Sequence, residues 1–208
     1  MKAVIFEKNA TPEKLVLREV EKPVPDDNQV LIEIHAASIN AADYRSMRMG
    51  IIPKHRIFGA DVAGRVVTAG SAVTELKPGD AVVGDLSGCG FGGFAEYAVA
   101  PAGVLALKPE NLSFEDAAAI PLAGVTALQG LRNLGKIQPG QRVLICGAGG
   151  GVGTFAVQLA KNFGAHVTAV CGPRSVDLVR SLGADCVIDY STEDFTRSSV
   201  RYDLILGI

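Results

Sequence analysis

The sequence predicts an α/β protein with a β-rich N-terminal domain followed by a doubly wound parallel sheet. Residues 1–112 hold many short apolar or alternating runs separated by Gly and Pro turns, which predicts a barrel of short strands. Beyond them, strand-like runs alternate with helical patterns, which is typical of parallel strands joined by helices. With 208 residues, 48% of them hydrophobic, the chain is large enough for two small domains, expected at 1–123 and 124–208.

In the N-terminal domain, short runs of apolar and β-branched residues mark the strands. The expected strands are Ala3–Phe6, Leu15–Val20, Gln29–Ala36, Asp61–Thr68, Ala81–Gly84 and Phe94–Val99. Ser113 is a candidate N-cap, with Asp116 at the third helical position, for a helix that runs through 117–119. Pro121 is expected to break that helix, and a second helix is expected at Gly124–Leu134.

In the C-terminal domain, apolar runs predict strands and periodic runs predict helices. The expected strands are Arg142–Cys146, His166–Cys171, Cys186–Ile188 and Tyr202–Leu206. The helix at 154–163 is expected to stop at Gly164, because glycine readily takes the left-handed conformation that ends helices. Ser175 is a candidate cap for a helix at Val176–Leu182, with Asp177 in its first turn.

A glycine-rich turn at 147–153 joins the strand Arg142–Cys146 to the following helix. The pattern G-x-G-x-x-G fails because Val152 stands at its last glycine, but G-x-x-G-x-x-G fits at Gly147, Gly150 and Gly153.

Each glycine of this turn has a physical role in the interpretation as a nucleotide site. Gly147 allows a sharp turn, Gly150 and Gly151 let backbone amides approach a pyrophosphate, and Gly153 lets the helix pack on the strand. An anion at the helix N-terminus is favoured by unpaired N–H groups and the helix dipole. The turn therefore predicts dinucleotide binding; the alternative is a flexible connection between two packed elements.

Charge and composition exclude several other classes of function. The net charge is −2 with acids and bases interspersed, which argues against a nucleic-acid partner. No apolar stretch approaches the roughly 20 residues of a membrane helix. The four cysteines form no C-x-x-C pair, which favours a reducing, cytoplasmic setting.

Ordered sequence blocks along the chain resemble one enzyme family. The blocks are NAADYRSMRMG at 40–50, GADVAGRVVTAG at 59–70, KPGDAVVGD at 77–85, GGFAEY at 92–97, IPLAGVTALQGL at 120–131, GAGGGVGTFAVQLAK at 147–161 and LGADCVIDY at 182–190. They resemble the medium-chain dehydrogenase/reductase superfamily, in its zinc-independent quinone oxidoreductase-like branch. The resemblance implies a GroES-like barrel with the substrate site, followed by a Rossmann domain that is partial here.

The resemblance implies that no catalytic zinc is bound. Zinc-dependent relatives have a cysteine where this chain has Asn40, and a histidine motif where it has Gly59-Ala60-Asp61. Only Cys89 lies in the region that holds a structural zinc in such relatives. Since zinc needs three or four convergent ligands, we expect none here.

The resemblance also implies which residues contact the cofactor and substrate. It places Asn40 beside the nicotinamide, Thr126 near it, and Val152 with the glycine turn against the ribose and pyrophosphate. Tyr44, one helical turn after Asn40, is the candidate proton donor, and its alternative is a tyrosine packed at the edge of the cleft.

Two basic residues next to Tyr44 allow a further interpretation of this segment. In that alternative, an ion-pair cluster of Asp43, Arg45 and Arg48 holds the segment in place.

Without a metal, polarisation of the substrate carbonyl has to come from hydrogen-bond donors around the nicotinamide.

The end of the strand at Cys171 predicts NADPH as the cofactor. An acid at this position accepts the ribose hydroxyls of NAD, whereas an arginine pairs with the 2′-phosphate of NADP. Arg174 stands where NADP-using relatives carry a basic residue, and Ser175 can add a hydrogen bond. The alternative is that Arg174 is solvated.

The predicted activity is metal-free hydride transfer from NADPH to a quinone or an α,β-unsaturated carbonyl. The sequence ends within an apolar run at 202–206, so we expect a fragment whose relatives continue with the rest of the cleft and a homodimer contact. Two alternatives stay open: a non-catalytic NADP(H)-binding module, inactive without a C-terminal half, and the enoyl-reductase module of a multidomain synthase.

Overall fold

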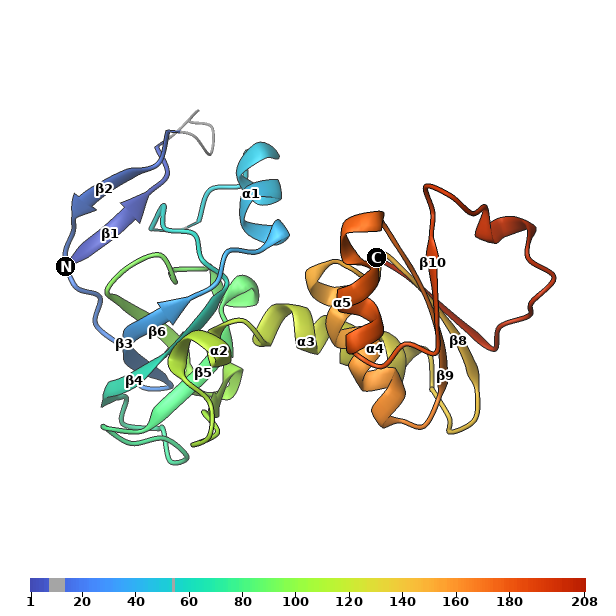
Figure 1. Ribbon diagram of the computed structural model, residues 1–208. Helices are drawn as coiled ribbons and strands as arrows, with labels where there is room; N and C mark the ends of the chain where they lie inside the picture. Colours follow the sequence, from blue (N-terminus) through green and yellow to red (C-terminus); the bar gives the residue numbers. More distant parts are fainter. Residues whose placement is uncertain (8–13, 54) are drawn as a thin grey trace. The chain divides into compact units, whose positions relative to one another are not determined.

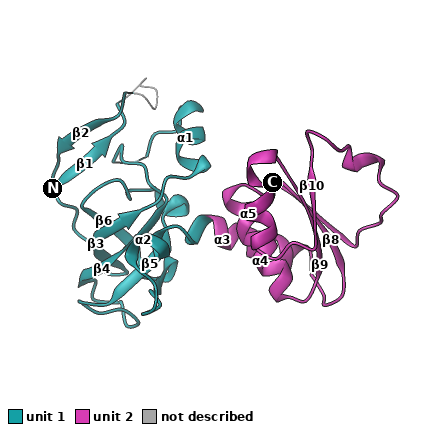
Figure 2. Ribbon diagram, viewed as in Figure 1, with its two compact units in different colours: residues 1–122 teal, residues 123–208 magenta. Residues whose placement is uncertain are grey.

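The computed structural model describes residues 1–7, 14–53 and 55–208. It divides into two compact units, Met1–Leu122 and Ala123–Ile208 (Figure 2). Each unit has its own hydrophobic core and is described by itself. No helix in the described part of the chain is both long and apolar enough to cross a membrane.

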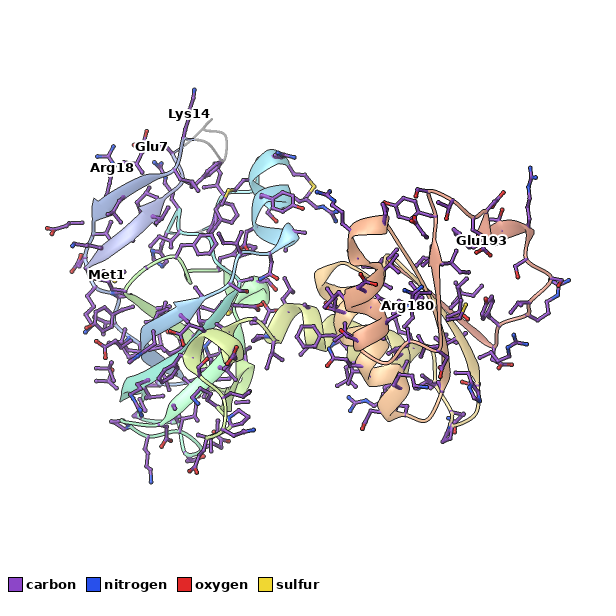
Figure 3. All side chains as sticks on the ribbon, viewed as in Figure 1. Met1, Glu7, Lys14, Arg18, Arg180 and Glu193 are labelled. Atoms are coloured by element: carbon purple, nitrogen blue, oxygen red, sulfur yellow. The ribbon has the colours of Figure 1, made fainter. Side chains whose placement is uncertain are left out.

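Unit 1 is built from antiparallel strands. Its strands are β1 (Lys2–Ile5), β2 (Val16–Glu19), β3 (Gln29–Ala37), β4 (Asp61–Ala69), β5 (Ala81–Asp85), β6 (Tyr97–Pro101) and β7 (Leu105–Leu107). β1 and β2 form a two-stranded sheet, and the other five pair in the order β6-β3-β4-β5-β7 (Figure 1). Isolated bridges Ala3↔Ala95 and Ile5↔Ile57 attach β1 to the rest of the unit. Arg18 of β2 pairs with Glu7 at 2.6 Å (Figure 3).

The core of unit 1 lies against the central strands of the five-stranded sheet. Val30 and Ile32 of β3 pack with Val62 and Val66 of β4 and Val82 of β5, and each of these side chains is almost fully buried. The short helices of the unit are α1 (Ala41–Arg48) and α2 (Phe114–Ala118), with 3-10 turns at Ser87–Cys89 and Ala102–Val104. Because successive side chains on a strand point to opposite faces of the sheet, the alternating apolar residues cover one face, and this face lies against the core.

Unit 2 is a parallel sheet with the strand order β10-β9-β8-β11. Its strands are β8 (Arg142–Cys146), β9 (His166–Cys171), β10 (Cys186–Asp189) and β11 (Leu204–Gly207). Its helical segments are α3 (Pro121–Leu128, which begins in unit 1), a π-helical stretch (Gln129–Leu134), α4 (Gly151–Asn162) and α5 (Val176–Ser181), with 3-10 turns at Pro173–Ser175 and Phe195–Arg197. The predicted α/β class is confirmed.

Helices α4 and α5 lie on one face of this sheet (Figure 1). Val143 and Ile145 of β8 and Val167 of β9 pack with Ala156 and Val157 of α4, and all five are 0% exposed. On the other face, Phe195 and Tyr202 pack against Leu144, Val170 and Ile188. The alanines at 156 and 160 let α4 approach the sheet closely.

Several local predictions hold. Ser113 caps α2, because its Oγ accepts the Asp116 N–H at 3.0 Å. β8 and β9 have the predicted bounds. Gly164 follows α4 with φ 78°, the left-handed conformation in which glycine ends helices.

Other element boundaries were predicted wrongly. The second helix begins at Pro121 rather than Gly124, since a missing N–H costs nothing at a first helical position, while the first helix ends before Pro121 as predicted, at Ala118. Helix α4 begins at Gly151, so part of the glycine run belongs to the helix. β6 begins at Tyr97, because Phe94 donates its N–H to the Phe58 carbonyl and Ala95 pairs with Ala3 instead. β7 was not predicted.

Candidate functional site

The glycine-rich turn leaves the carboxyl end of β8 and enters α4. Gly147 takes φ 83°, a left-handed conformation that disfavours other residues. The N–H groups of Gly147 and Ala148 donate to the Val170 carbonyl of β9 at 3.1 and 3.0 Å, and the Gly150 N–H donates to the Gly147 carbonyl at 3.0 Å. The turn is therefore tied to the neighbouring strand and closed on itself.

Two glycines of the turn are required by packing inside the protein. A Cβ at Gly149 would lie 2.5 Å from both Cβ and Oγ of Ser175, so this glycine lets the 173–175 turn approach. A Cβ at Gly153 would overlap the Gly147 carbonyl oxygen and lie 2.7 Å from the Ala148 Cα. Gly153 thus lets α4 approach the turn itself, whereas the sequence predicted an approach to the strand.

Two other glycines leave space that no protein atom fills. A Cβ at Gly151 would meet only the Ala123 Cβ, at 4.0 Å, and one at Gly150 would meet only the Gly147 carbonyl oxygen, at 3.4 Å. Both residues have ordinary backbone angles, since neither is among the glycines with positive φ. Packing therefore does not explain these two glycines, whereas a ligand that comes close to the backbone would.

The N-terminus of α4 faces this open space with backbone donors. Gly150 is the N-cap residue, so the N–H groups of Gly151, Val152 and Gly153 lie in the first turn, where a helix offers no acceptor of its own. Unpaired donors and the dipole of the 12-residue helix both favour an anion there. The residues of the turn thus fit the pyrophosphate of a dinucleotide.

The strand order gives the same location independently. Read in chain order, β10-β9-β8-β11 is the order 3-2-1-4, which reverses direction between β8 and β11. In open parallel sheets, ligands bind at the carboxyl ends of the strands where the order reverses. Gly147 lies at this point: a Cβ on it would be 3.2 Å from the Ile208 carbonyl oxygen, just beyond β11.

The turn after β9 brings Ser175 to the glycine turn, and Arg174 precedes it in the same turn. Ser175 is the N-cap residue of α5, as predicted, but its side chain makes no capping hydrogen bond and packs on Gly149 instead. Arg174 is exposed and takes part in none of the ion pairs found among the described residues. Asp177 pairs with Arg180 at 3.5 Å, which leaves Arg174 without an acidic partner in this turn.

Tyr190 is a candidate that the sequence analysis missed. It follows β10, its N–H donates to the Cys171 carbonyl at 3.2 Å, and its side chain is 62% exposed. A Cβ on Gly172 would lie 2.9 Å from the Tyr190 hydroxyl, so this hydroxyl lies beside a residue only two positions before Arg174. The signal was available in the sequence, because parallel strands end at the same sheet edge and Tyr190 directly follows one of them.

Thr126 lies on the exposed side of α3. Like the glycine turn, Arg174 and Ser175, it belongs to unit 2. Asn40 and Tyr44 belong to unit 1.

Asn40 and Tyr44 lie at the start and middle of α1. Asn40 is the N-cap residue, and Tyr44 is 38% exposed with its ring 5.6 Å from the Arg48 guanidinium. Asp43 is not in an ion-pair cluster with Arg45 and Arg48, so that interpretation is wrong. Its carboxylate accepts the Asn40 N–H at 2.7 Å.

Asp43 instead holds the loop before β4. It is 1% exposed and accepts the Gly59 and Ala60 N–H groups at 3.1 Å each. Burial raises its pKa, and the hydrogen bonds to backbone N–H groups oppose that shift. Asp43 therefore joins α1 to the residues just before Asp61.

Asp61, the first residue of β4, is fully buried and bound to Asn40. Its Oδ2 accepts the Ser38 hydroxyl and the Asn40 Nδ2, both at 3.0 Å, and its Oδ1 accepts the Leu122 N–H at 2.9 Å. Burial raises the pKa of Asp61 to about 6, with a smaller contribution from the negative charge of Asp85, while its three hydrogen bonds oppose the shift.

Asn40 and residues 59–61, which the resemblance sets in place of the cysteine and histidine motif of zinc-dependent relatives, are thus part of a hydrogen-bond network. Among residues 1–7, 14–53 and 55–208, no group of three or more His, Cys, Asp and Glu side chains is arranged to hold a metal ion. His35 stacks on Phe114 at 4.3 Å between ring centroids, so it is a packing residue.

Two family models match the chain, one in each unit. The Alcohol dehydrogenase GroES-like domain matches residues 26–110, and the Zinc-binding dehydrogenase model matches residues 151–201. The chain is 42% identical to the chloroplast envelope quinone oxidoreductase homolog of Arabidopsis thaliana over 202 residues, which are 90% of this chain and 61% of that protein. The chain therefore spans less than two thirds of this curated relative's length.

Solved structures resemble it closely. The quinone oxidoreductase of Coxiella burnetii has a TM-score of 0.90 at 36% identity, covering 99% of this chain and 67% of that one. The Escherichia coli quinone oxidoreductase complexed with NADPH has a TM-score of 0.84 at 32% identity, covering 93% of this chain and 60% of that one. The predicted GroES-like and Rossmann domains are confirmed, and the chain belongs to the medium-chain dehydrogenase/reductase superfamily, in its quinone oxidoreductase-like branch.

Proposed function

We propose that this chain provides the cofactor site and part of the substrate site of an NADPH-dependent reductase of quinones or α,β-unsaturated carbonyls. The observation that carries the proposal is the open space at Gly150 and Gly151 beside the α4 N-terminus, with Arg174 on the adjoining turn. Because a quinone contains a conjugated C=C–C=O unit, both substrate classes accept a hydride in the same way. NADPH supplies that hydride when it is bound.

The residues of the chain bind and orient the reactants. The first-turn amides of α4 hold the pyrophosphate, and Arg174 pairs with the 2′-phosphate. Ser175 and Tyr190 offer hydroxyl groups to the same phosphate from the flanking turns. Asn40 and Thr126 orient the nicotinamide, and the Tyr44 hydroxyl is the candidate proton donor.

The reaction proceeds, in this proposal, without a metal ion. The support is that Asn40 stands where metal-dependent relatives have a cysteine, that Gly59-Ala60-Asp61 replaces their histidine motif, and that Asn40 and Asp61 bind each other. Hydrogen-bond donors then have to stabilise the charge that develops on the substrate oxygen. A cytoplasmic location and a homodimer stay predictions; the Arabidopsis thaliana relative is named as a chloroplast envelope protein.

Arg174→Ala tests the cofactor assignment. We expect the Kd for NADPH to rise about 10- to 100-fold, because a charged hydrogen-bonded contact contributes roughly 1.5–3 kcal/mol. The Kd for NADH should stay within about twofold, since NADH has no 2′-phosphate. Isothermal titration of both cofactors measures the two values.

Arg180→Ala is the matched control, because Arg180 is another exposed arginine of unit 2 and its partner is Asp177. It should leave both affinities unchanged. Equal loss of NADPH and NADH affinity in the Arg174 variant would contradict the phosphate assignment. NADPH binding without reduction of any quinone or enone by the full chain would favour the non-catalytic alternative.

A further inference from the structure

Asp61 collects hydrogen bonds from three separate segments of unit 1. Ser38 lies just after β3, Asn40 caps α1, and Leu122 is the second residue of α3. The residue is 0% exposed, so no solvent molecule competes for its oxygens. Burying an ionised carboxylate costs free energy unless hydrogen-bond partners are held in place around it.

The network has a defined direction. An ionised carboxylate only accepts hydrogen bonds, so Asn40 has to turn its NH₂ group, not its oxygen, toward Asp61. The Ser38 hydroxyl also donates to Asp61, and its oxygen therefore accepts the second Asn40 N–H, at 2.9 Å. The Asn40 nitrogen is thus held against Ser38 and Asp61, and its oxygen, which faces the Asp43 N–H in the capping box of α1, keeps a lone pair for one further hydrogen bond.

We propose that Asp61 is the positioning residue of this site, which holds Asn40 as a hydrogen-bond acceptor and joins it to the first turn of α3. The inference rests on the proposed function, in which Asn40 faces the cofactor. It assigns a role to Asn40: because its nitrogen is held by Asp61 and Ser38, the amide presents its oxygen, a hydrogen-bond acceptor, away from the network. Asn40 receives an N–H or O–H group of the cofactor or substrate, and the polarising donor is another group, for which Tyr44 is the candidate.

The contact with Leu122 extends the effect to a second element. The Leu122 N–H is one of the first-turn donors that α3 cannot satisfy internally, and a negative charge at a helix N-terminus is favourable. Thr126 lies one turn further along the same helix. One carboxylate thus fixes both Asn40 and the start of the helix that carries Thr126.

Protonation of Asp61 would reverse the network. The charged groups around Asp61 are acidic: Asp85 stands directly opposite it on β5, Asp43 lies on α1, and α3 contributes a backbone N–H. A protonated carboxyl donates a hydrogen bond where Asn40 and Ser38 already donate. Turnover should therefore fall as the pH falls through about 6, where the pKa of Asp61 lies.

An exchange of the two side chains tests the proposal in the full chain, with NADPH and a soluble quinone. Asp61→Asn leaves a single oxygen at position 61 for the Leu122 N–H on one side and the Ser38 and Asn40 donors on the other, so one side of the network is lost. We expect kcat to fall about tenfold, with the Kd for NADPH within about twofold of wild type. Asn40→Asp alone places two carboxylates in contact and should lower kcat further. The double variant should recover to within about threefold of wild type, because the carboxylate now at position 40 again presents an oxygen outward while the amide now at position 61 donates to it.

The outcomes separate the possible failures. A double variant that folds but is as slow as the slower single variant would show that the Asn40 N–H groups act directly, which overturns the inference. The inference would also be overturned if kcat of the Asp61→Asn enzyme fell below pH 6 in the same way as kcat of wild type. Asp80→Asn, in the turn before β5, should leave kcat and its pH profile unchanged. Absence of NADPH binding by wild type would refute the proposed function instead.

A second measurement does not depend on activity. In ¹⁵N-labelled protein, the side-chain amide resonances of Asn40 should shift between pH 7 and pH 5 in wild type and stay constant in Asp61→Asn. Resonances that do not respond to pH in wild type would overturn the inference even if the enzyme is active.

Discussion

Gly153→Ala is expected to destabilise unit 2 by about 3 kcal/mol or more and to lower its Tm by about 10 °C or more. The added Cβ would overlap the Gly147 carbonyl oxygen and lie 2.7 Å from the Ala148 Cα and 2.8 Å from the Ala148 carbonyl carbon. All three are backbone atoms of a turn tied to β9, so no side chain can rotate away. Thermal unfolding followed by circular dichroism measures the loss.

Gly151→Ala is the matched control, two residues away in the same helix. Its Cβ would meet nothing closer than the Ala123 Cβ at 4.0 Å, so stability should stay the same or rise by up to about 1 kcal/mol. The affinity for NADPH should nevertheless fall at least about tenfold, because the methyl group enters the space next to the first-turn amides. If this variant binds NADPH as tightly as wild type, the pyrophosphate does not lie there.

Asp61→Asn is expected to make the protein more stable above pH 6, by an amount on the order of 3 kcal/mol. The carboxyl titrates at about 6 in the folded protein, against its usual 3.8 in an unfolded chain. Because the folded protein holds the proton more tightly, the stability from Asp61 is fully present below pH 3.8 and is lost as the pH rises through 6. Asparagine stays neutral and avoids this loss.

Urea unfolding of wild type and Asp61→Asn between pH 4 and pH 8 measures the effect. The two proteins should be nearly equal at pH 4, and their difference should grow up to about pH 6 and then level off. A constant difference across this range would mean that Asp61 does not titrate as its burial implies. A variant that is more stable but slower would show that the carboxylate serves the site rather than the fold.

The sequence predicted those features that depend on neighbouring residues. Arg142–Cys146 and His166–Cys171 were placed correctly because each is an apolar run bounded by turn residues. Ser113 was recognised as a cap because its partner, Asp116, is three residues away. The glycine turn was recognised because its strand and helix directly flank it.

Features that depend on distant residues were not predictable. Ser175 has the sequence of a cap, but its contact with Gly149, 26 positions earlier, decides its conformation. Asp61 is separated by 61 residues from Leu122, and no local pattern connects them. Likewise, Gly130 and Gly135 are explained by packing against β11, since a Cβ on Gly130 would lie within 3 Å of the Leu206 side chain and one on Gly135 within 3 Å of the Leu204 side chain.

The contact between Ser175 and Gly149 limits how the cofactor preference of this protein can be redesigned. A larger residue at 175 would push on the backbone of the glycine turn, so a change meant for the adenosine end would also disturb the pyrophosphate end. Arg174 and Tyr190 are exposed and carry no such coupling. A library that seeks an NADH-using variant should therefore vary residues 174 and 190 and keep serine at 175.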